Sequence, residues 1–176
     1  AHCVLTGTNG NFYIGPANGN GDANFSGDSS TVNMYFWGAQ IEAGTYPTPY
    51  VKTLNSSVTK INVSKNLIPY SQDFSQWSKY NSGDTLNTNT VLAPDGVSYM
   101  QGIIASTDNN GHPRYKNITT ISGTTYCFSF FVKKGNKNWI LVELYTATDN
   151  DMGHFFNLDT LTWGTQFGAG LTNKGY

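Results

Sequence analysis

The chain has 176 residues, a formal net charge of −1, 12% charged residues, 14% aromatic residues and 19 glycines. This length allows one ordinary domain to bury a core without disulfide or metal support. No basic cluster is longer than Lys133-Lys134, so the attraction on which nucleic-acid binding depends is missing and we expect no nucleic-acid partner. No run approaches the roughly 20 apolar residues of a membrane-spanning helix, so we expect no membrane span.

Apolar and polar residues alternate over short runs along the chain, and Gly, Asn, Asp or Pro repeatedly separates these runs. This pattern is typical of an all-β fold with many turns. In the first part we expect strands over 1–5, 12–16, 32–41 and 58–63. In the remainder we expect strands over 67–68, 91–92, 100–104, 112–116, 125–133, 139–146, 153–157 and 161–165.

Strand alternation assigns faces in the two most apolar segments. In 125–133, one face carries Tyr126, Phe128, Phe130 and Val132, and we expect it to point inward. In 139–146, both faces are substantially apolar: one carries Ile140, Val142 and Leu144, and the other carries Trp139, Leu141, Glu143 and Tyr145. Such a strand is central in its sheet, or its outer face is covered or binds a ligand.

The two cysteines, Cys3 and Cys127, lie far apart in strand-like contexts. We expect two free buried thiols, with a disulfide as the alternative, because a sequence does not show whether two strands meet.

The residues from 35 to 53 read YFWGAQIEAGTYPTPYVKT. This segment resembles the closing strand of a jelly-roll module found in bacteriophage tail and fibre proteins and in bacterial surface proteins. The residues from 66 to 77 read NLIPYSQDFSQW and resemble the opening strand of the same module. That segment, an Ala-Pro-Asp-Gly turn at 93–96 and the 125–135 stretch also resemble family 4/9-like carbohydrate-binding modules.

The closing-strand segment, 35–53, therefore precedes the opening-strand segment, 66–77, so the two parts of the module stand in permuted order. The resemblance implies that residues 1–54 form the C-terminal part of one jelly-roll module, that 55–65 form a linker, and that 66–176 form the N-terminal part of the next or the same module. We expect an all-β jelly-roll β-sandwich, completed between the permuted halves or by a neighbouring copy, because an open edge strand favours a pairing partner.

The family's members serve as accessory and adhesive modules, so the resemblance implies a non-catalytic structural and adhesive module of a phage tail fibre or other extracellular appendage. It implies a place in the virion, outside the cell or at the cell surface, with host-surface glycans and neighbouring copies or a homo-oligomer as partners. The alternative is an accessory carbohydrate-binding module of a secreted polysaccharide-degrading enzyme.

Sugar binding is the main functional prediction, because flat aromatic faces stack on pyranose rings while polar side chains bond the hydroxyls. The preferred candidates are Trp139, Tyr145, and Tyr115 with Arg114. Trp77, Tyr80 and Trp163 are further aromatic candidates, of which Trp77 and Trp163 are expected to pack in the core.

A structural calcium ion is a second possibility that the carbohydrate-binding resemblance implies. Asp73 near the opening strand and Glu42 near the closing strand are the candidate ligands, because calcium binds carboxylate and backbone oxygens. Other acidic loops, among them the one with Asp149 and Asp151, are alternatives, and solvated loops without a metal are favoured over both.

An enzyme is the least favoured reading. His2, His112 and His154 lie in unrelated contexts without partners at triad-like or metal-binding spacing. A glycosidase would need a pocket that joins an acid to a second titratable group.

Overall fold

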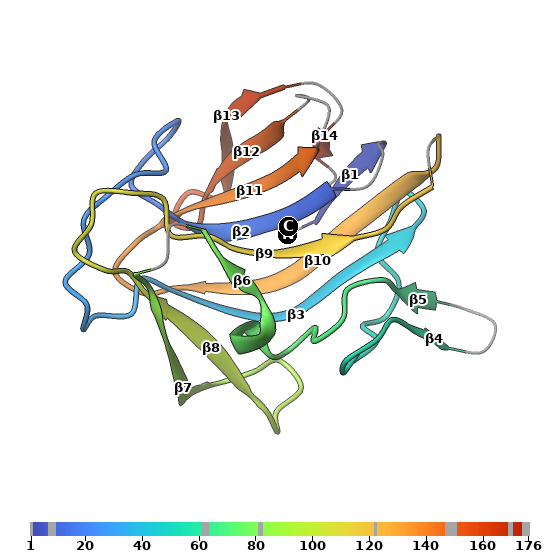
Figure 1. The fold of residues 1–176 in the computed structure, drawn as a ribbon, viewed down its shortest axis with the longest axis horizontal. Coiled ribbons are helices and arrows are strands. Elements are labelled where there is room, and N and C mark those ends of the chain that lie inside the picture. Colours follow the sequence, from blue (N-terminus) through green and yellow to red (C-terminus); the bar gives the residue numbers. More distant parts are fainter. Residues whose placement is uncertain are drawn as a thin grey trace.

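The computed structural model describes residues 2–6, 10–60, 64–80, 83–121, 123–146, 151–168 and 171–173. Within these ranges the chain forms strands and one short 3₁₀ helix, η1 (Phe74–Gln76). Two six-stranded antiparallel sheets lie against each other and enclose a common core (Figure 1). The protein is therefore an all-β sandwich.

The two sheets each combine strands from distant parts of the sequence. The first sheet has the order β14 (Leu171–Asn173), β1 (His2–Thr6), β10 (Thr125–Lys134), β3 (Met34–Ala43), β8 (Tyr99–Ile104), β7 (Thr85–Leu92). The second sheet has the order β13 (Thr162–Phe167), β12 (Met152–Asn157), β11 (Trp139–Thr146), β2 (Gly10–Ala17), β9 (Arg114–Ile118), β6 (Ser78–Lys79). A separate hairpin joins β4 (Val58–Lys60) and β5 (Ser64–Asn66).

The early strands are inserted among the late ones. β1 and β3 lie on either side of β10, and β2 lies between β11 and β9. The halves before residue 54 and after residue 66 thus complete one sandwich within a single chain. The assignment of these halves to parts of jelly-roll modules stays a prediction.

Most expected strands coincide with observed ones, within two residues at their ends. The expected strand at Leu67-Ile68 is wrong: the amide of Ile68 donates to the side chain of Asn66, and Pro69 has no N–H to continue a ladder. The sequence patterns missed β5, β6, β14 and the first half of β7. Residues 61–63, at the end of the expected 58–63 strand, lie outside the described residues.

The predicted inward face of β10 is confirmed: Tyr126, Phe128 and Phe130 are buried in the core between the sheets, and Val132 packs partly buried against it. In β11, where the pattern left both faces open, Ile140, Val142 and Leu144 point into this core. Phe12 and Phe128 meet across it, with ring centroids 4.0 Å apart. The predicted core position of Trp77 is confirmed, and Trp163 packs against the same core while partly buried.

The Trp37-Gly38 pair shapes β3. The register of β3 on β10 shifts between Ser129 and Phe131, and Gly38 at this irregularity has φ +63°, a left-handed conformation that glycine adopts most easily. A Cβ at Gly38 would also lie only 3.3 Å from the ring of Phe131. The bulge leaves Trp37 on the outer face, where its indole Nε1 donates to Ser98 Oγ at 2.9 Å.

Candidate functional site

The outer face of the second sheet carries a group of tyrosines. Phe12 and Ile14 of β2 point into the core, so Tyr13 between them points outward. Tyr13 pairs with Tyr115 on β9 and with Glu143 on β11. Three adjacent strands therefore bring together side chains that are more than 100 residues apart in sequence.

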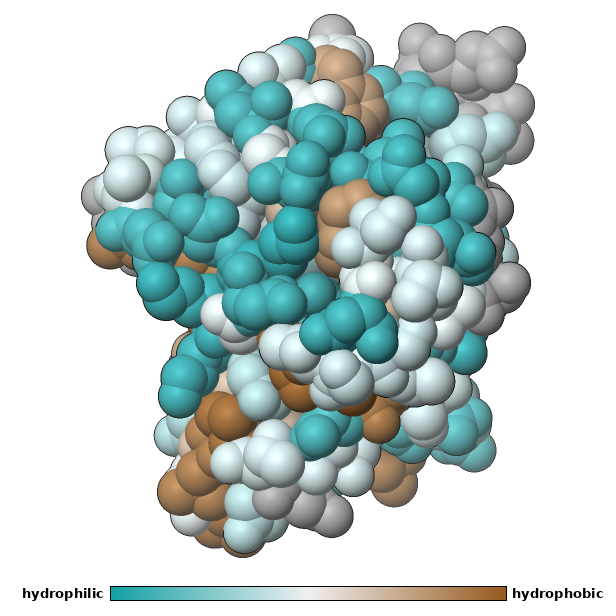
Figure 2. All heavy atoms as spheres, turned by 90° about the vertical axis from the view of Figure 1, so that its left-hand side faces the viewer, coloured by the Kyte–Doolittle hydropathy of each residue, from teal (hydrophilic) through white to brown (hydrophobic). Residues whose placement is uncertain are grey.

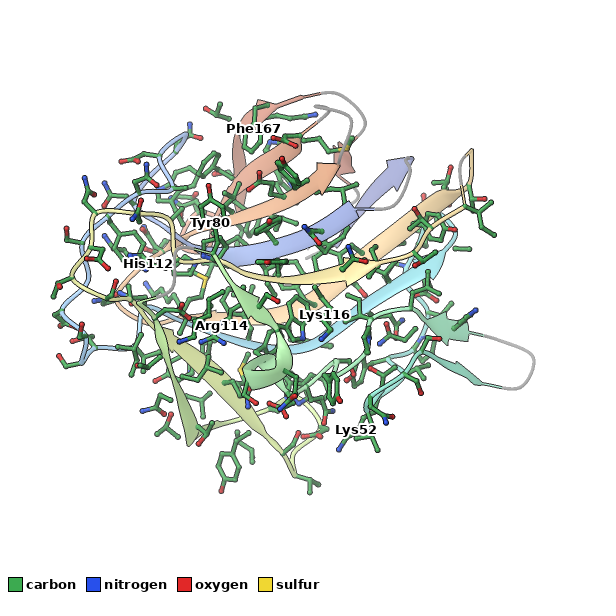
Figure 3. The ribbon with its side chains drawn as sticks, viewed as in Figure 1. Lys52, Tyr80, His112, Arg114, Lys116 and Phe167 are labelled. Atoms are coloured by element: carbon green, nitrogen blue, oxygen red, sulfur yellow. The ribbon has the colours of Figure 1, made fainter. Side chains whose placement is uncertain are left out.

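These side chains lie at the floor of a cleft of about 740 Å³, here called the tyrosine cleft. Its walls come from the edges of the sheet and from two loops. In Figure 3, Tyr80 lies near the left end of β2 and Phe167 lies above β11, near β13. The described residues that line it are Tyr13, Gly21, Asp22, Ala23, Asn24, Lys79, Tyr80, Gly111, Pro113, Tyr115, Leu141, Glu143, Tyr145, Asp151, Phe155 and Phe167.

Two loops at one end of the sandwich, 18–33 and 105–113, support the cleft wall and lie together at the left of Figure 1. The amide of Phe25 donates to Asn110 O at 3.1 Å, and His112 Nε2 lies 3.0 Å from Phe25 O. Figure 2 shows mainly hydrophilic side chains over the middle of this end and hydrophobic ones near the bottom, where the β7–β8 hairpin lies. His112 thus has a structural role in joining the loops.

Three tyrosine rings are arranged around Tyr13. Tyr115 stacks on it with centroids 4.7 Å apart, and Tyr80 and Tyr145 approach it edge-on at 5.9 and 6.4 Å. Tyr13 is 7% exposed, whereas Tyr80 and Tyr145 are 48% and 44% exposed. Tyr13 is therefore the fixed centre of the group, and its neighbours present ring surface to solvent.

The cleft is acidic. Burial, together with the nearby charge of Asp151, raises the pKa of Glu143 to about 7. Burial and the neighbouring Tyr115 raise the pKa of Tyr13 to about 12, so this phenol stays neutral. Hydrogen bonds from the Asn18 side chain and the Asn24 amide lower the pKa of Asp22 and keep it charged. Lys79 also lines the cleft, and its ammonium donates to the backbone oxygen of Asp84 at 2.6 Å.

Of the predicted sugar-binding residues, Tyr115 and Tyr145 are brought together in the cleft. Trp139 does not line the cleft. It lies at the other end of β11 and packs against a small cluster formed by Ala17, Leu141 and Phe155. A Cβ at Gly164 would come within 2.7 Å of its indole ring, so β13 packs closely beside it. Trp139 thus serves packing on the outer face of the sheet.

Arg114 lies inside the protein instead of beside Tyr115, because neighbouring residues of a strand point to opposite faces. It is 3% exposed. Its Nε and Nη2 each lie 2.7 Å from Asp84 Oδ2, and its Nη1 donates to Phe74 O at 3.1 Å. The guanidinium is a buried structural group in this arrangement.

Glu42, a predicted calcium ligand, accepts three hydrogen bonds within the protein. Its Oε1 accepts from Gln40 Nε2 and the Thr48 amide, both at 2.7 Å, and its Oε2 accepts from Thr48 Oγ1 at 2.5 Å. The side chain is buried. These bonds fold the segment after β3 back onto the strand.

Asp73, the other predicted calcium ligand, caps η1. Its Oδ1 accepts from the amide of Ser75 at 3.1 Å and from Ser75 Oγ at 2.5 Å. Within the described ranges, no group of three or more His, Cys, Asp or Glu side chains is placed to hold a metal ion. The calcium prediction stays a prediction.

Sequence reasoning missed Tyr13 and did not connect Glu143 with Asp151. Tyr13 carried a usable signal, since it alternates with the apolar Phe12 and Ile14 in an expected strand. Glu143 was assigned to the same face as Tyr145, and Asp151 only to a loop. Their shared cleft follows from the pairing of β11 with β12, in which Glu143 lies opposite Gly153.

The fold and cleft define a β-sandwich with an aromatic and acidic cleft on one sheet. No protein-family model matches the chain, and neither a curated protein nor a solved structure matches it. In the part of the chain that the structure describes, no helix has the length and apolar character needed to cross a membrane.

Proposed function

We propose that this protein is a non-catalytic glycan-binding module and that the tyrosine cleft is its binding site. The observation that carries the proposal is the arrangement of Tyr80, Tyr115 and Tyr145 around Tyr13 in a cleft of about 740 Å³. Exposed aromatic rings provide apolar surface for sugar rings. Nearby carboxylate and amide groups provide hydrogen-bond partners for the hydroxyls.

The wider setting that we propose is a phage tail fibre or other extracellular appendage, in the virion or at a cell surface. The resemblance of residues 35–53 and 66–77 to jelly-roll modules supports this setting, and host-surface glycans would be the ligands. An accessory module of a secreted polysaccharide-degrading enzyme is the alternative, with the same binding cleft. Neighbouring copies of the module are further proposed partners.

A glycan array with the intact chain, followed by calorimetric titration of the sugars that bind, tests the proposal. Tyr115→Ala and Tyr145→Ala should each weaken binding about five- to tenfold, the equivalent of one aromatic contact. Tyr99→Ala is the matched control, because Tyr99 is 46% exposed on β8 of the other sheet. Its affinity should equal that of the unmodified protein.

Two results would contradict this assignment. Equal losses in the Tyr99→Ala and Tyr145→Ala proteins would place binding outside the tyrosine cleft. No glycan signal from the folded chain would remove glycan binding and leave a scaffold role.

Glycoside hydrolysis is a second candidate function, and one observation favours it. Glu143 and Asp151 share the cleft, and burial and Asp151 raise the pKa of Glu143 to about 7, as a general acid at neutral pH requires. Release of new reducing ends from a glycan that binds, abolished by Glu143→Gln, would support this function. Binding without any release of reducing ends supports the non-catalytic module.

A further inference from the structure

We propose that the tyrosine cleft selects saccharides that carry a free, positively charged amine over neutral and acidic ones. This inference rests on the proposed glycan-binding function and names the chemical class of its ligand. The cleft combines aromatic faces with an excess of negative charge, which is the combination that an ammonium group favours.

The charge balance of the cleft is the first argument. Among the described residues, Asp22, Glu143 and Asp151 line it, against one cation, Lys79. The Lys79 ammonium is turned to the backbone oxygen of Asp84, 2.6 Å away. A uronate or sialate would meet repulsion from Asp22 and Asp151, and from Glu143 once it ionises, whereas an amino sugar would meet attraction.

Asp151 also carries an unsatisfied oxygen. Its Oδ1 is shielded from solvent and finds no hydrogen-bond donor among the described residues. A buried acceptor without a donor is energetically costly, so a small turn of this carboxylate toward an N–H group of a ligand in the cleft would be favourable. An ammonium has three such donors and also carries the opposite charge.

The aromatic rings supply the second argument. Tyr80 and Tyr145 are each about half exposed and lie beside the central Tyr13. The faces of tyrosine rings attract cations, and the attraction strengthens when the cation is desolvated. The same rings stack on the apolar face of a pyranose, so one amino sugar residue satisfies both the rings and the carboxylates.

Titration calorimetry at pH 6.5 with three β-1,4-linked hexamers of the same length tests the inference: glucosamine, N-acetylglucosamine and glucose. The glucosamine hexamer should bind about tenfold more tightly than the other two, equivalent to one favourable charge contact. Raising the salt to 0.5 M should reduce that preference, since exposed charges are screened.

Asp151→Asn should reduce the preference about threefold or more, because it removes one cleft carboxylate at nearly constant shape. Glu143→Gln should reduce it less at pH 6.5, because Glu143, with its pKa of about 7, is mostly protonated there. Asp159→Asn is the matched control: it removes an exposed carboxylate that bonds Lys134 and Asn138 outside the cleft, and it should keep the full preference. Thermal melts of all variants establish that each is folded.

The outcomes separate this inference from the function on which it rests. Equal binding of all three hexamers, or tighter binding of a neutral one, would overturn the amine preference and leave glycan binding in place. A preference for glucosamine that Glu143→Gln and Asp151→Asn both leave unchanged would also overturn it. If no saccharide of any class binds, both proposals fail.

Discussion

The side chain of Asn66 holds the backbone of Ile41, although 24 residues separate them. Asn66 Oδ1 accepts from the Ile41 amide at 3.2 Å and from the Ile68 amide at 3.0 Å. Its Nδ2 donates to Ala39 O at 3.0 Å and to Val51 O at 2.9 Å. One fully buried side chain therefore joins the 35–53 and 66–77 segments.

Asn66→Ala should lower the free energy of unfolding by at least about 3 kcal/mol, because it leaves several buried backbone groups without partners. Urea denaturation followed by tryptophan fluorescence measures this loss. Asn138→Ala, which removes an exposed hydrogen bond to Asp159, is the control and should change stability by less than about 1 kcal/mol. Similar losses in the two variants would contradict the joining role of Asn66.

Arg114→Met should destabilise the protein by about 3–5 kcal/mol, because the Asp84 carboxylate would stay buried without its counter-charge. The double variant Arg114→Met/Asp84→Leu should recover part of this loss. Lys134→Met removes an exposed ion pair with Asp159 and should cost less than about 1 kcal/mol. A marginal effect of Arg114→Met in chemical denaturation would show that the guanidinium is not needed to compensate Asp84.

Glu143 should make the protein less stable as the pH rises. Its folded pKa of about 7 exceeds the ordinary value of 4.5, so between these values the folded state keeps a proton that the unfolded state has lost. The raised pKa therefore decreases stability across this window, by about 3 kcal/mol at most.

Unfolding free energies of the unmodified and Glu143→Gln proteins at pH 4.5 and pH 8 measure this effect. The variant should gain stability relative to the unmodified protein as the pH rises. Asp22, Asp73, Asp95 and Asp159 have lowered pKa values, so they titrate below this pH window, and they do so in both proteins. A constant difference between the two proteins would mean that Glu143 titrates normally.

Cys127 should react with thiol reagents only after unfolding. It is a free cysteine in β10 with no exposed surface, as expected from the sequence, and burial together with the charge of Glu42 raises its pKa to about 12. In a Cys3→Ser background at pH 8, labelling by a disulfide reagent should be slow in buffer and fast in denaturant. Fast labelling of the folded protein would contradict the buried position.

The sequence alone located most strands and the inward face of β10. Phe128 and Phe130 share one face of their strand with Tyr126 and Val132, and this period of two predicted their inward positions. Tyr115 and Tyr145, predicted as sugar-binding aromatics, both line the cleft, and their binding of sugars stays a prediction. The predictions of strands and of the inward face of β10 succeed because the side chains of a strand alternate wherever the strand lies.

The buried position of Arg114 was not predicted from the sequence. Its aromatic neighbour Tyr115 suggested a binding pair, but adjacent strand residues face opposite ways, and Asp84 lies on the inner side. The segment Leu67-Ile68 was also predicted wrongly. Its apolar residues suggested a strand, but the Ile68 amide donates to the side chain of Asn66 instead of to a neighbouring strand.

The composition and alternation of the chain determined an all-β protein with inward and outward faces. Only the tertiary structure decided that Tyr13, Tyr115 and Glu143 share one cleft, because their meeting depends on the order and register of β9, β2 and β11. Alternation is a local property of the backbone, whereas strand order and register result from the packing of the whole chain.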